Sequence, residues 1–261
     1  MGSDDEQASD AGTPPYLSIV VPAYNEAVRL PETLRTIAAY LARKPFASEI
    51  IVVDDGSTDA TAALAAAVIA PSMGRVLRES HRGKGASVRA GMLAARGNRV
   101  LFTDADLAVP IEEADAMLAA LDAGYGVVIG SREGEGASRE GEPAFRHVMG
   151  RVFNRLVRLI AVPGIDDTQC GFKLFRADAV AAIMPRLHLY GADAPVVRGA
   201  RVTGFDVEVL VIARRQGFRI HEAPVRWRYG VQSKVRPVAD TFWNMRDVLR
   251  VRLNDLRGYY R

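Results

Sequence analysis

The chain has a single cysteine, Cys170, among its 261 residues. One thiol cannot form an internal disulfide, so a disulfide scaffold and a cysteine-rich zinc site are excluded, and a reducing compartment is favoured. The charge excess is small as well, since 34 basic side chains face 31 acidic ones for a net +3. Such a balance gives no general attraction to a polyanion, and we expect no nucleic-acid partner.

Long apolar runs are missing. The longest uncharged segments, Ala11 to Asn25 and Ala60 to Gly74, are each interrupted by proline, whereas a membrane-spanning helix needs about 20 predominantly apolar residues. We therefore expect that the chain does not cross a membrane by itself. The first residues are acidic and contain Pro14 and Pro15, the reverse of a secretory signal, so a disordered tail is predicted over residues 1–15.

Two common phosphate-binding motifs are absent. No G-x-G-x-x-G follows the first apolar run, and Gly83-Lys84-Gly85 lacks the glycine spacing and the Ser or Thr of a P-loop. These absences argue against a dinucleotide-dependent dehydrogenase and against a P-loop kinase.

From Tyr16 onward, short apolar runs alternate with segments of helical periodicity, without an internal repeat. This alternation predicts an α/β fold with a single, mostly parallel, Rossmann-like sheet covered by helices on both faces. Ligands of such sheets bind at the carboxyl ends of the strands. Strands are predicted at Leu17 to Val21, Ile50 to Val53, Arg99 to Thr103 and Val127 to Ile129, and helices at Pro31 to Ala42, after Asp59 and at Glu112 to Leu121.

Carboxylates follow two of these strands. Asp54 and Asp55 leave the second strand, where a carboxylate can accept hydrogen bonds from a base or ribose; a turn with a helix cap at Ser57 to Asp59 explains them equally well. Asp104-Ala105-Asp106 leaves the strand that ends at Thr103. Two carboxylates separated by one small residue suit Mg²⁺ or Mn²⁺, which prefer oxygen ligands.

Six motifs together resemble the family-2 glycosyltransferases. They cover the chain from Leu17 to about Pro237, and they look most like the dolichyl- or polyprenyl-phosphate glucosyltransferases, which are inverting GT-A enzymes that use a nucleotide sugar and a divalent metal. The resemblance implies a glycosyltransferase domain over residues 16–237, followed by a basic amphipathic helix over residues 238–261. The motifs are Ser18 to Glu26, Val52 to Asp59, Gly83 to Gly85, Asp104 to Leu107, Gly130 to Arg132 and Asp167 to Lys173.

The resemblance also implies roles for individual residues. Asp106, with Asp104, matches the metal-binding positions, and Arg132 matches an arginine near the transferred sugar and phosphate. The positions that match donor-binding residues are Pro22, Tyr24, Glu26, Val53, Asp54, Asp55, Lys84, Asp104, Ala105, Asp106, Arg132, Arg228 and Lys234.

The acceptor implied is a polyprenyl or dolichyl phosphate. Its phosphate oxygen is already charged, so it needs no strong general base. Asp167 is the nearest base, or a residue that orients the acceptor; a carboxylate that orders the turn at Gly171 is the alternative. We expect catalytic roles for Asp104, Asp106, Asp167 and Arg132, and acceptor binding by Gln169, Lys173 and Arg151.

The donor is expected to be UDP-glucose or a related UDP-sugar, because Asp167 to Lys173 resembles the glucosyltransferase branch and Ala108 replaces the glutamine usual in mannosyl enzymes. Three alternatives stay open: a GDP-mannose-dependent polyprenyl-phosphate mannosyltransferase, a soluble glycosyltransferase acting on a saccharide or protein hydroxyl, and a non-catalytic nucleotide-sugar binding module.

Two segments predict a membrane surface as partner. His147 to Val162 and Asp240 to Leu256 each place apolar side chains on one stripe and arginines beside it, as in an interfacial helix; a surface helix with a solvated basic face is the alternative. From Arg201 onward, thirteen basic residues face six acidic ones, a local excess of +7. An anionic leaflet attracts such a cluster, so we expect a peripheral protein on the cytoplasmic face of a membrane.

Three further expectations concern single segments. Glu133 to Pro143 is glycine-rich and charged, which predicts a mobile loop over the site, and Phe205 to Glu208 is expected to be mostly structural. The carboxyl-terminal membrane spans of some relatives are not found, so an integral membrane partner or a homo-oligomer is expected.

Overall fold

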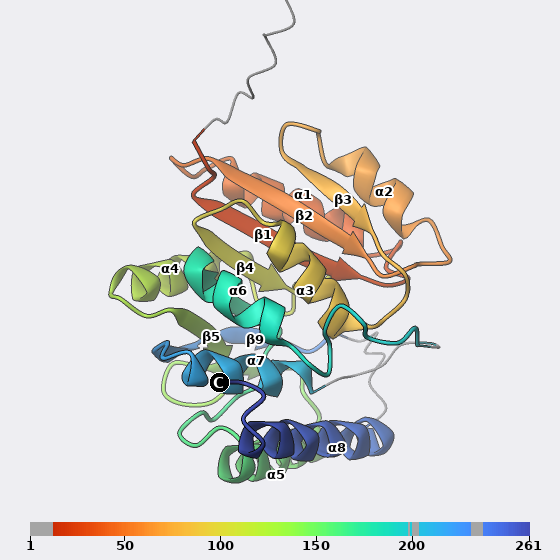
Figure 1. The fold of residues 1–261 in the computed structure, drawn as a ribbon. Coiled ribbons are helices and arrows are strands. Elements are labelled where there is room, and N and C mark those ends of the chain that lie inside the picture. Colours follow the sequence, from red (N-terminus) through yellow and green to blue (C-terminus); the bar gives the residue numbers. More distant parts are fainter. Residues whose placement is uncertain (1–12, 198, 200–203, 231–236) are drawn as a thin grey trace, which may run out of the picture.

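A seven-stranded sheet forms the centre of the computed structural model, which describes residues 13–197, 199, 204–230 and 237–261 (Figure 1). The strand order is β3-β2-β1-β4-β7-β5-β8. Neighbouring strands are parallel, except that β7 runs antiparallel to both β4 and β5. The strands are β1 (Leu17–Ala23), β2 (Ser48–Asp54), β3 (Gly74–Arg78), β4 (Arg99–Thr103), β5 (Val127–Ser131), β7 (Phe172–Arg176) and β8 (Ile220–Pro224).

Helices cover both faces of this sheet. One face packs against α1 (Leu30–Leu41), α2 (Thr61–Val68), the 3-10 turn η1 (Ile111–Glu113) and α4 (Ala114–Asp122). The other packs against α3 (Lys84–Ala94), α6 (Ala177–Ile183), the 3-10 turn η2 (Met184–Arg186) and α7 (Phe205–Arg215), with α5 (Ala144–Ile160) and α8 (Pro237–Leu256) completing that layer. A separate pair of parallel strands is formed by β6 (Ser138–Glu140) and β9 (Arg226–Arg228).

The sequence of the central strands explains this two-sided burial. Successive side chains of a strand point to opposite faces. In β1, Leu17, Ile19 and Val21 join the core on the α1 side, while Val20 joins the core on the α3 side. All four are fully buried, as expected for strands between two helical layers.

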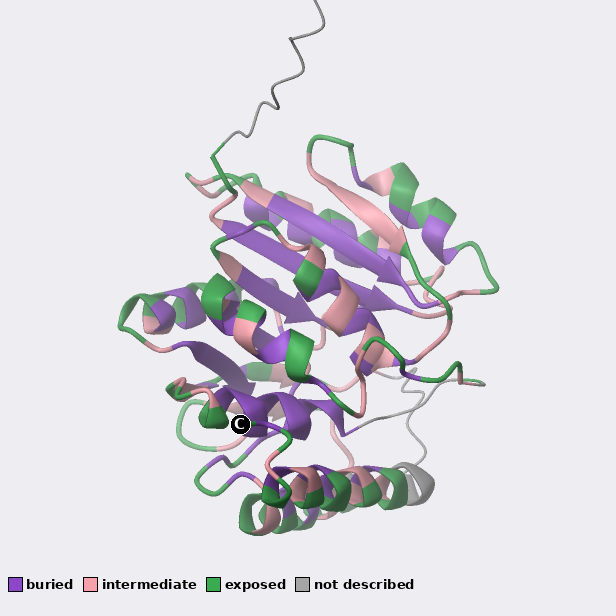
Figure 2. Ribbon diagram, viewed as in Figure 1, coloured by how far each residue is buried: buried purple, intermediate pink, exposed green. Residues whose placement is uncertain are grey.

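Helices α5 and α8 lie side by side at the end of the molecule away from β3 (Figure 1). Both expose much of their surface, whereas the strands of the sheet are mostly buried (Figure 2). Val248 and Val251 nonetheless bury α8 against the core. Among the described residues, no helix is long and apolar enough to span a bilayer.

The reversed strand β7 positions the functional loops. Because β7 is antiparallel to β4, its first residue, Phe172, pairs with the last residue of β4, Thr103. The loop that precedes β7 therefore lies at the same edge of the sheet as the carboxyl ends of β1, β2, β4 and β5.

The predicted strands and helices are confirmed, with shifts of a few residues at their ends. Phe205 to Glu208 are the first turn of α7 rather than a segment ahead of the helix. The predicted loop at Glu133 to Pro143 contains β6, and its Arg139 pairs with both Glu133 and Glu142; its mobility remains a prediction. Most of the predicted amino-terminal tail, residues 1–12, lies outside the described residues.

Candidate active site

The Asp-Ala-Asp motif follows β4 at the carboxyl edge of the sheet. Asp104 lies with Oδ1 2.5 Å from Nζ of Lys84, the first residue of α3. The carbonyl of Ala105 accepts a hydrogen bond of 2.8 Å from Oγ1 of Thr33 in α1. A Cβ at Gly171 would lie 2.0 Å from Oδ2 of Asp104, so the loop before β7 can approach Asp104 only with glycine at this position.

Asp106 is the second carboxylate of the motif, and its side chain is 32% exposed, against 36% for Asp104. Its Oδ1 accepts a hydrogen bond of 3.2 Å from the amide of Ala108, and Oδ2 lies 3.8 Å from Nη1 of Arg29. Burial and the neighbouring Asp104 carboxylate raise the pKa of Asp106 above its ordinary value. A cation placed between the two carboxylates would remove this repulsion.

The donor set at the motif fits a magnesium or manganese ion. Within the described part of the chain, no group of three or more His, Cys, Asp or Glu side chains is arranged to hold a metal. Mg²⁺ is commonly held by only one or two carboxylates, with water and substrate phosphates completing the octahedron. Asp106 and Asp104 therefore supply as many ligands as such a site needs.

The end of β2 organises the loop in front of α3. The buried Asp55 carboxylate accepts hydrogen bonds of 2.9 Å from the amides of both Arg82 and Gly83, and its Oδ2 lies 2.8 Å from Nδ1 of His81. His81 in turn stacks on Tyr24, with ring centroids 3.8 Å apart and an interplanar angle of 6°. Asp55 thus holds a loop and does not cap the helix that follows Asp59.

Not every predicted donor residue presents its side chain to the site. Val53 is fully buried and packs under Gly91 of α3, so only its main chain can face a donor. Pro22 lies buried within β1, and Asp54 is buried with Oδ1 3.3 Å from the amide of Ser57. Side-chain contact of Val53 with the donor is therefore excluded by core packing.

One acidic and one basic residue between β1 and α1 form an ion pair. Glu26 and Arg29 make a two-point ion pair, one contact of which is 2.8 Å. Arg29 thereby comes within reach of Asp106. Arg29 was not predicted as a site residue, because its position three residues after Glu26 is the one signal that the sequence offers for it.

Asp167 forms a buried ion pair with Arg132. Its carboxylate is fully buried and accepts three hydrogen bonds from Arg132, at 2.7 Å from Nε, 2.8 Å from Nη2 and 2.9 Å from the amide. Burial favours the neutral acid, but the Arg132 guanidinium outweighs this effect and holds the pKa of Asp167 well below its ordinary value. The residue fixes Arg132, which retains N–H donors at its other positions.

Lys173 is wrong as an acceptor-binding residue. It is fully buried, and its Nζ donates to Oδ1 of Asp206 at 2.5 Å and to the carbonyl of Cys170 at 2.5 Å. Asp206 also faces Lys84, whose pKa is raised by Asp104 and Asp206 even though burial lowers it. The ion pair connects α7 to β7, and it confirms the structural role expected for Phe205 to Glu208.

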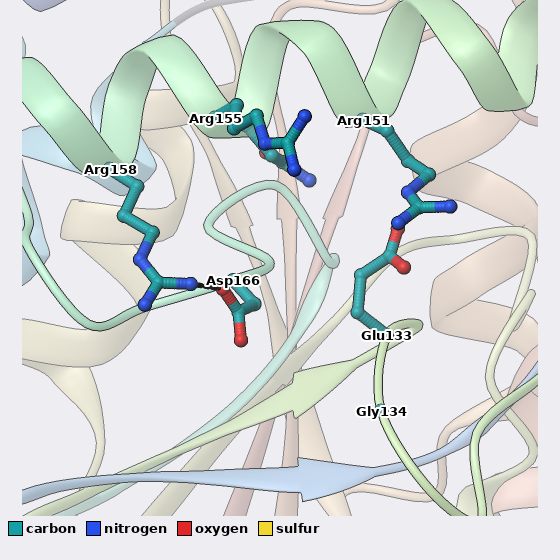
Figure 3. Close-up of a pocket in the computed structure, with 7 residues that line it drawn as sticks. Glu133, Gly134, Arg151, Arg155, Arg158 and Asp166 are labelled. Carbon is teal, nitrogen blue, oxygen red and sulfur yellow. Dashed lines mark hydrogen bonds and ion pairs between the residues drawn. The ribbon is translucent and has the colours of Figure 1, made fainter.

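A polar pocket of about 260 Å³ opens beside the Arg132–Asp167 pair, between α5 and the loops at Glu133 and Asp166 (Figure 3). Arg151, predicted to bind the acceptor, lines it with Arg155 and Arg158. Arg158 pairs with Asp166, whereas Arg151 and Arg155 have no carboxylate partner among the described residues. The lining residues are Glu133, Gly134, Arg151, Asn154, Arg155, Arg158 and Asp166.

Asn154 connects this pocket to the ion pair. It is 5% exposed, its Nδ2 lies 3.4 Å from Oδ1 of Asp167, and its Oδ1 is buried without a hydrogen-bond partner. The sequence analysis missed Asn154, because one asparagine in an amphipathic helix carries no functional signal. Gln169 is half-buried, and its main-chain amide donates a hydrogen bond of 3.2 Å to Oδ1 of Asp167.

The segment after β9 passes close to the Asp-Ala-Asp motif. The amide of Arg228 donates to the carbonyl of Ala108 at 2.8 Å, and a Cβ at Gly230 would lie 3.9 Å from Oδ2 of Asp106. The side chain of Arg228 pairs with Glu140 at 3.0 Å on the surface. Lys234, the other predicted diphosphate contact of this segment, lies outside the described residues.

An α/β sheet with a two-carboxylate loop and paired cations at its carboxyl edge defines a nucleotide-dependent transferase site. The family model "Glycosyl transferase family 2" matches residues 18–184, and the chain belongs to this family of glycosyltransferases. It is 36% identical to the dolichyl-phosphate beta-glucosyltransferase of Dictyostelium discoideum, over 94% of this chain and 76% of that protein. The enzyme of the same name from Drosophila melanogaster is 37% identical, over 94% and 77%.

Solved structures confirm the expected fold. Glucosyl-3-phosphoglycerate synthase from Mycobacterium tuberculosis, crystallised with Mn²⁺, UDP and glucosyl-3-phosphoglycerate, matches with a TM-score of 0.64 and 19% identity, covering 94% of this chain and 80% of that chain. Mannosyl-3-phosphoglycerate synthase from Rubrobacter xylanophilus gives a TM-score of 0.62 at 18% identity, covering 94% and 74%. The predicted GT-A fold and family are therefore correct.

Proposed function

We propose that this glycosyltransferase transfers glucose from UDP-glucose to a dolichyl or polyprenyl phosphate, with inversion at the anomeric carbon. The names of the relatives at 36% and 37% identity support the donor sugar and the acceptor class. The observation that carries the proposal is the arginine-rich pocket of α5 beside Asp167, a carboxylate whose pKa is lowered by its ion pair with Arg132.

The nature of the acceptor follows from that carboxylate. A sugar or protein hydroxyl must lose a proton as it attacks, so its enzyme needs a positioned base. Asp167 is ion-paired with Arg132 and has a lowered pKa, which makes it a poor proton acceptor. A phosphate monoester attacks through an oxygen that is already negative. It needs cations to draw it in, and Arg151 and Arg155 provide them.

In the proposed reaction, the acceptor phosphate oxygen forms the new bond to the anomeric carbon as the bond between that carbon and the β-phosphate of UDP breaks. Arg132, held in place by Asp167, stabilises the negative charge of the phosphates with its remaining N–H donors. Lys84 fixes the orientation of Asp104. UDP leaves with both electrons of the broken bond.

A divalent cation held by Asp106, with Asp104, would neutralise the diphosphate charge that develops on UDP. Its support is the donor set of two neighbouring carboxylates, together with the raised pKa of Asp106.

The membrane surface supplies the lipid acceptor. On α5, the predicted apolar stripe is exposed, with exposed fractions of 60% for Val148, 55% for Val152 and 80% for Leu159. On α8, Phe242 and Leu256 are exposed by 67% and 64%. The arginines beside these stripes favour an anionic leaflet, so we place the enzyme peripherally on the cytoplasmic face.

A donor and acceptor panel tests the proposal. The purified chain is incubated with Mg²⁺, a polyprenyl phosphate and, in turn, UDP-glucose, UDP-galactose, UDP-N-acetylglucosamine and GDP-mannose, and the lipid product is identified by mass. We expect a hexose adduct with UDP-glucose. A product with GDP-mannose alone would identify a mannosyltransferase, and transfer to free saccharides in place of the lipid phosphate would contradict the acceptor class.

A further inference from the structure

A second, smaller cavity lies between α8 and the loop in front of α3. It shares no lining residue with the arginine-rich pocket of α5. Its volume is about 140 Å³, below the range of pockets for drug-sized ligands, so it suits one small group. Its polar lining consists of three arginines, Arg82, Arg246 and Arg250, with Trp243, Tyr190 and one carboxylate, Asp247. The rest of the lining is a glycine and apolar side chains, namely Gly83, Leu189, Ala194, Pro195 and Val197.

The cavity carries a surplus of positive charge and of unused donors. Nε of Arg82 is buried without a hydrogen-bond partner, while its Nη1 donates to the carbonyl of Ala192 at 2.5 Å. Within the described residues, neither Arg246 nor Arg250 pairs with a carboxylate. The Asp247 carboxylate is the one acidic group among the described residues that line the cavity, and its Oδ2 accepts from the hydroxyl of Tyr190 at 2.5 Å and from the amide of Gly204 at 3.3 Å.

Trp243 and Arg246 form one wall together. The guanidinium carbon of Arg246 lies 5.2 Å from the centre of the Trp243 ring, within the range of a cation–π contact. The ring is 37% exposed, as is common for tryptophan at a membrane–water boundary. The contact holds one cation of the cavity beside an amphipathic side chain.

The helical spacing of α8 places this cavity beside an apolar surface. At about 100° per residue, Trp243, Arg246 and Arg250 fall on one stripe of the helix. The next stripe carries Phe242 and Leu249, with exposed fractions of 67% and 54%. If the apolar stripe enters a lipid layer, the cavity therefore lies at the level of the phosphates.

We infer that this cavity binds the phosphate of an anionic phospholipid headgroup, with Arg82, Arg246 and Arg250 as its donors. The inference rests on the membrane location in the proposed function and adds a defined site to it. It differs from general attraction between a basic surface and an anionic leaflet, because the binding energy is concentrated in residues that line the cavity.

A pair of matched substitutions separates a defined site from general charge. Arg250→Gln and Arg257→Gln each remove one positive charge, seven residues apart, from α8 and from the turn that follows it, but only Arg250 lines the cavity. Sedimentation with vesicles of phosphatidylcholine and phosphatidylglycerol measures the apparent affinity. We expect Arg250→Gln to weaken binding tenfold or more and Arg257→Gln by less than threefold, with melting temperature and UDP affinity of both variants equal to those of the parent.

Equal losses in the two variants would overturn the headgroup site while leaving the membrane location intact. No binding of the parent to either vesicle would overturn the membrane location and the site together, without affecting transfer to a detergent-dispersed acceptor. Calorimetry with inorganic phosphate tests whether the cavity binds a free phosphate rather than a lipid headgroup. Micromolar binding that is lost in Arg250→Gln would identify a site for a free phosphate and overturn the lipid assignment; no binding at millimolar phosphate agrees with it.

Discussion

Each carboxylate at the site has its own electrostatic surroundings, and these separate the carboxylates that can hold a cation from those that cannot. Asp167 and Asp206 are buried against Arg132 and Lys173, respectively, so their charge is already matched. Asp104 forms an ion pair with Lys84. Asp106 has the longest ion-pair distance of these four among the described residues, 3.8 Å to Nη1 of Arg29. A cation brought by the substrate would therefore bind first at Asp106.

Replacement of this carboxylate tests its role. Asp106→Ala is expected to reduce glucose transfer more than tenfold while the melting temperature stays within a few degrees, because an exposed loop side chain contributes little to stability. Product formation and thermal unfolding are measured on the same sample, with Glu32→Ala as an exposed control on α1. Turnover within tenfold of the parent would contradict the assignment of Asp106 to the metal.

Asp167→Asn tests the buried ion pair through its pH dependence. The variant leaves the Arg132 guanidinium buried without a counter-ion, which is expected to cost about 3–5 kcal/mol at pH 7. The folded-state pKa of Asp167 is lowered, so its stabilising contribution is complete above the unfolded-state value of about 4. It decreases as the pH falls through the folded-state value.

Urea unfolding from pH 7 to pH 3 measures this difference. We expect the gap between parent and variant to narrow below about pH 4. Asp178→Asn is the matched control, because its partner Arg176 holds it in an ion pair on the surface, where such pairs contribute about 1 kcal/mol or less. A constant gap over the whole range would show that Asp167 does not act through its charge.

Asp55 tests how the donor site is held in place. Asp55→Ala removes the acceptor of the Arg82 and Gly83 amides, so the loop before α3 loses its anchor. We expect UDP affinity, measured by calorimetry, to fall tenfold or more, while the turnover of enzyme saturated with donor changes by less than threefold. An unchanged UDP affinity would show that the loop keeps its position without this carboxylate.

Helix α5 presents two functions on two faces, and its apolar stripe can be tested separately from its fold. Leu159 is 80% exposed, whereas Val157 on the same helix is fully buried. Leu159→Gln is expected to change the free energy of unfolding by less than about 0.5 kcal/mol and to weaken binding to anionic vesicles. Val157→Ala should do the reverse, with a stability loss of about 1 kcal/mol or more. If the Leu159→Gln variant binds vesicles as tightly as the parent does, the result would contradict a contact between α5 and the membrane surface.

The sequence predicts the strands and helices whose patterns are strong, including β1, β2, β4 and the amphipathic helices α5 and α8. It does not predict the direction of β7, because the strand Phe172–Arg176, with Lys173 among its apolar residues, has the same pattern in either direction. The same limit applies to Lys173. A lysine next to a glycine motif looks like an anion-binding residue, and only the packing of α7 against β7 shows that Asp206 neutralises it.

Partners at the site are likewise set by tertiary packing. Asp167 follows a helix and a glycine. Nothing in the neighbouring sequence indicates that Arg132, 35 residues earlier, donates hydrogen bonds to it. Asp104, Asp106 and Asp55 were identifiable because each lies within three residues of the end of a buried strand, where a parallel sheet collects its ligand-binding residues.

Helix α5 carries four arginines and no acidic residue, and it lies beside α8 at the end of the molecule away from β3 (Figure 1). The triple variant Arg246→Glu, Arg250→Glu and Arg257→Glu reverses charge there and is expected to release the protein from anionic vesicles. UDP affinity should stay unchanged, because none of the three contacts the Asp-Ala-Asp motif.

Binding of the parent should also weaken with salt, since exposed charges are screened over about 8 Å at physiological ionic strength. Salt-independent binding would contradict an electrostatic attachment.

The antiparallel strand β7 has a consequence for the order in which the chain assembles. The half-sheet β3-β2-β1-β4 uses residues 17–103 and can form as a continuous unit. β5 pairs only with β7 and β8, so residues 127–131 have no place in the sheet until the ribosome has released the chain beyond residue 176. Arg132, Asp167 and the arginine pocket therefore come together late, through contacts distant in sequence that are slow to close. Nascent chains halted shortly before β7 should hold a protected amino-terminal half-sheet and an unprotected β5.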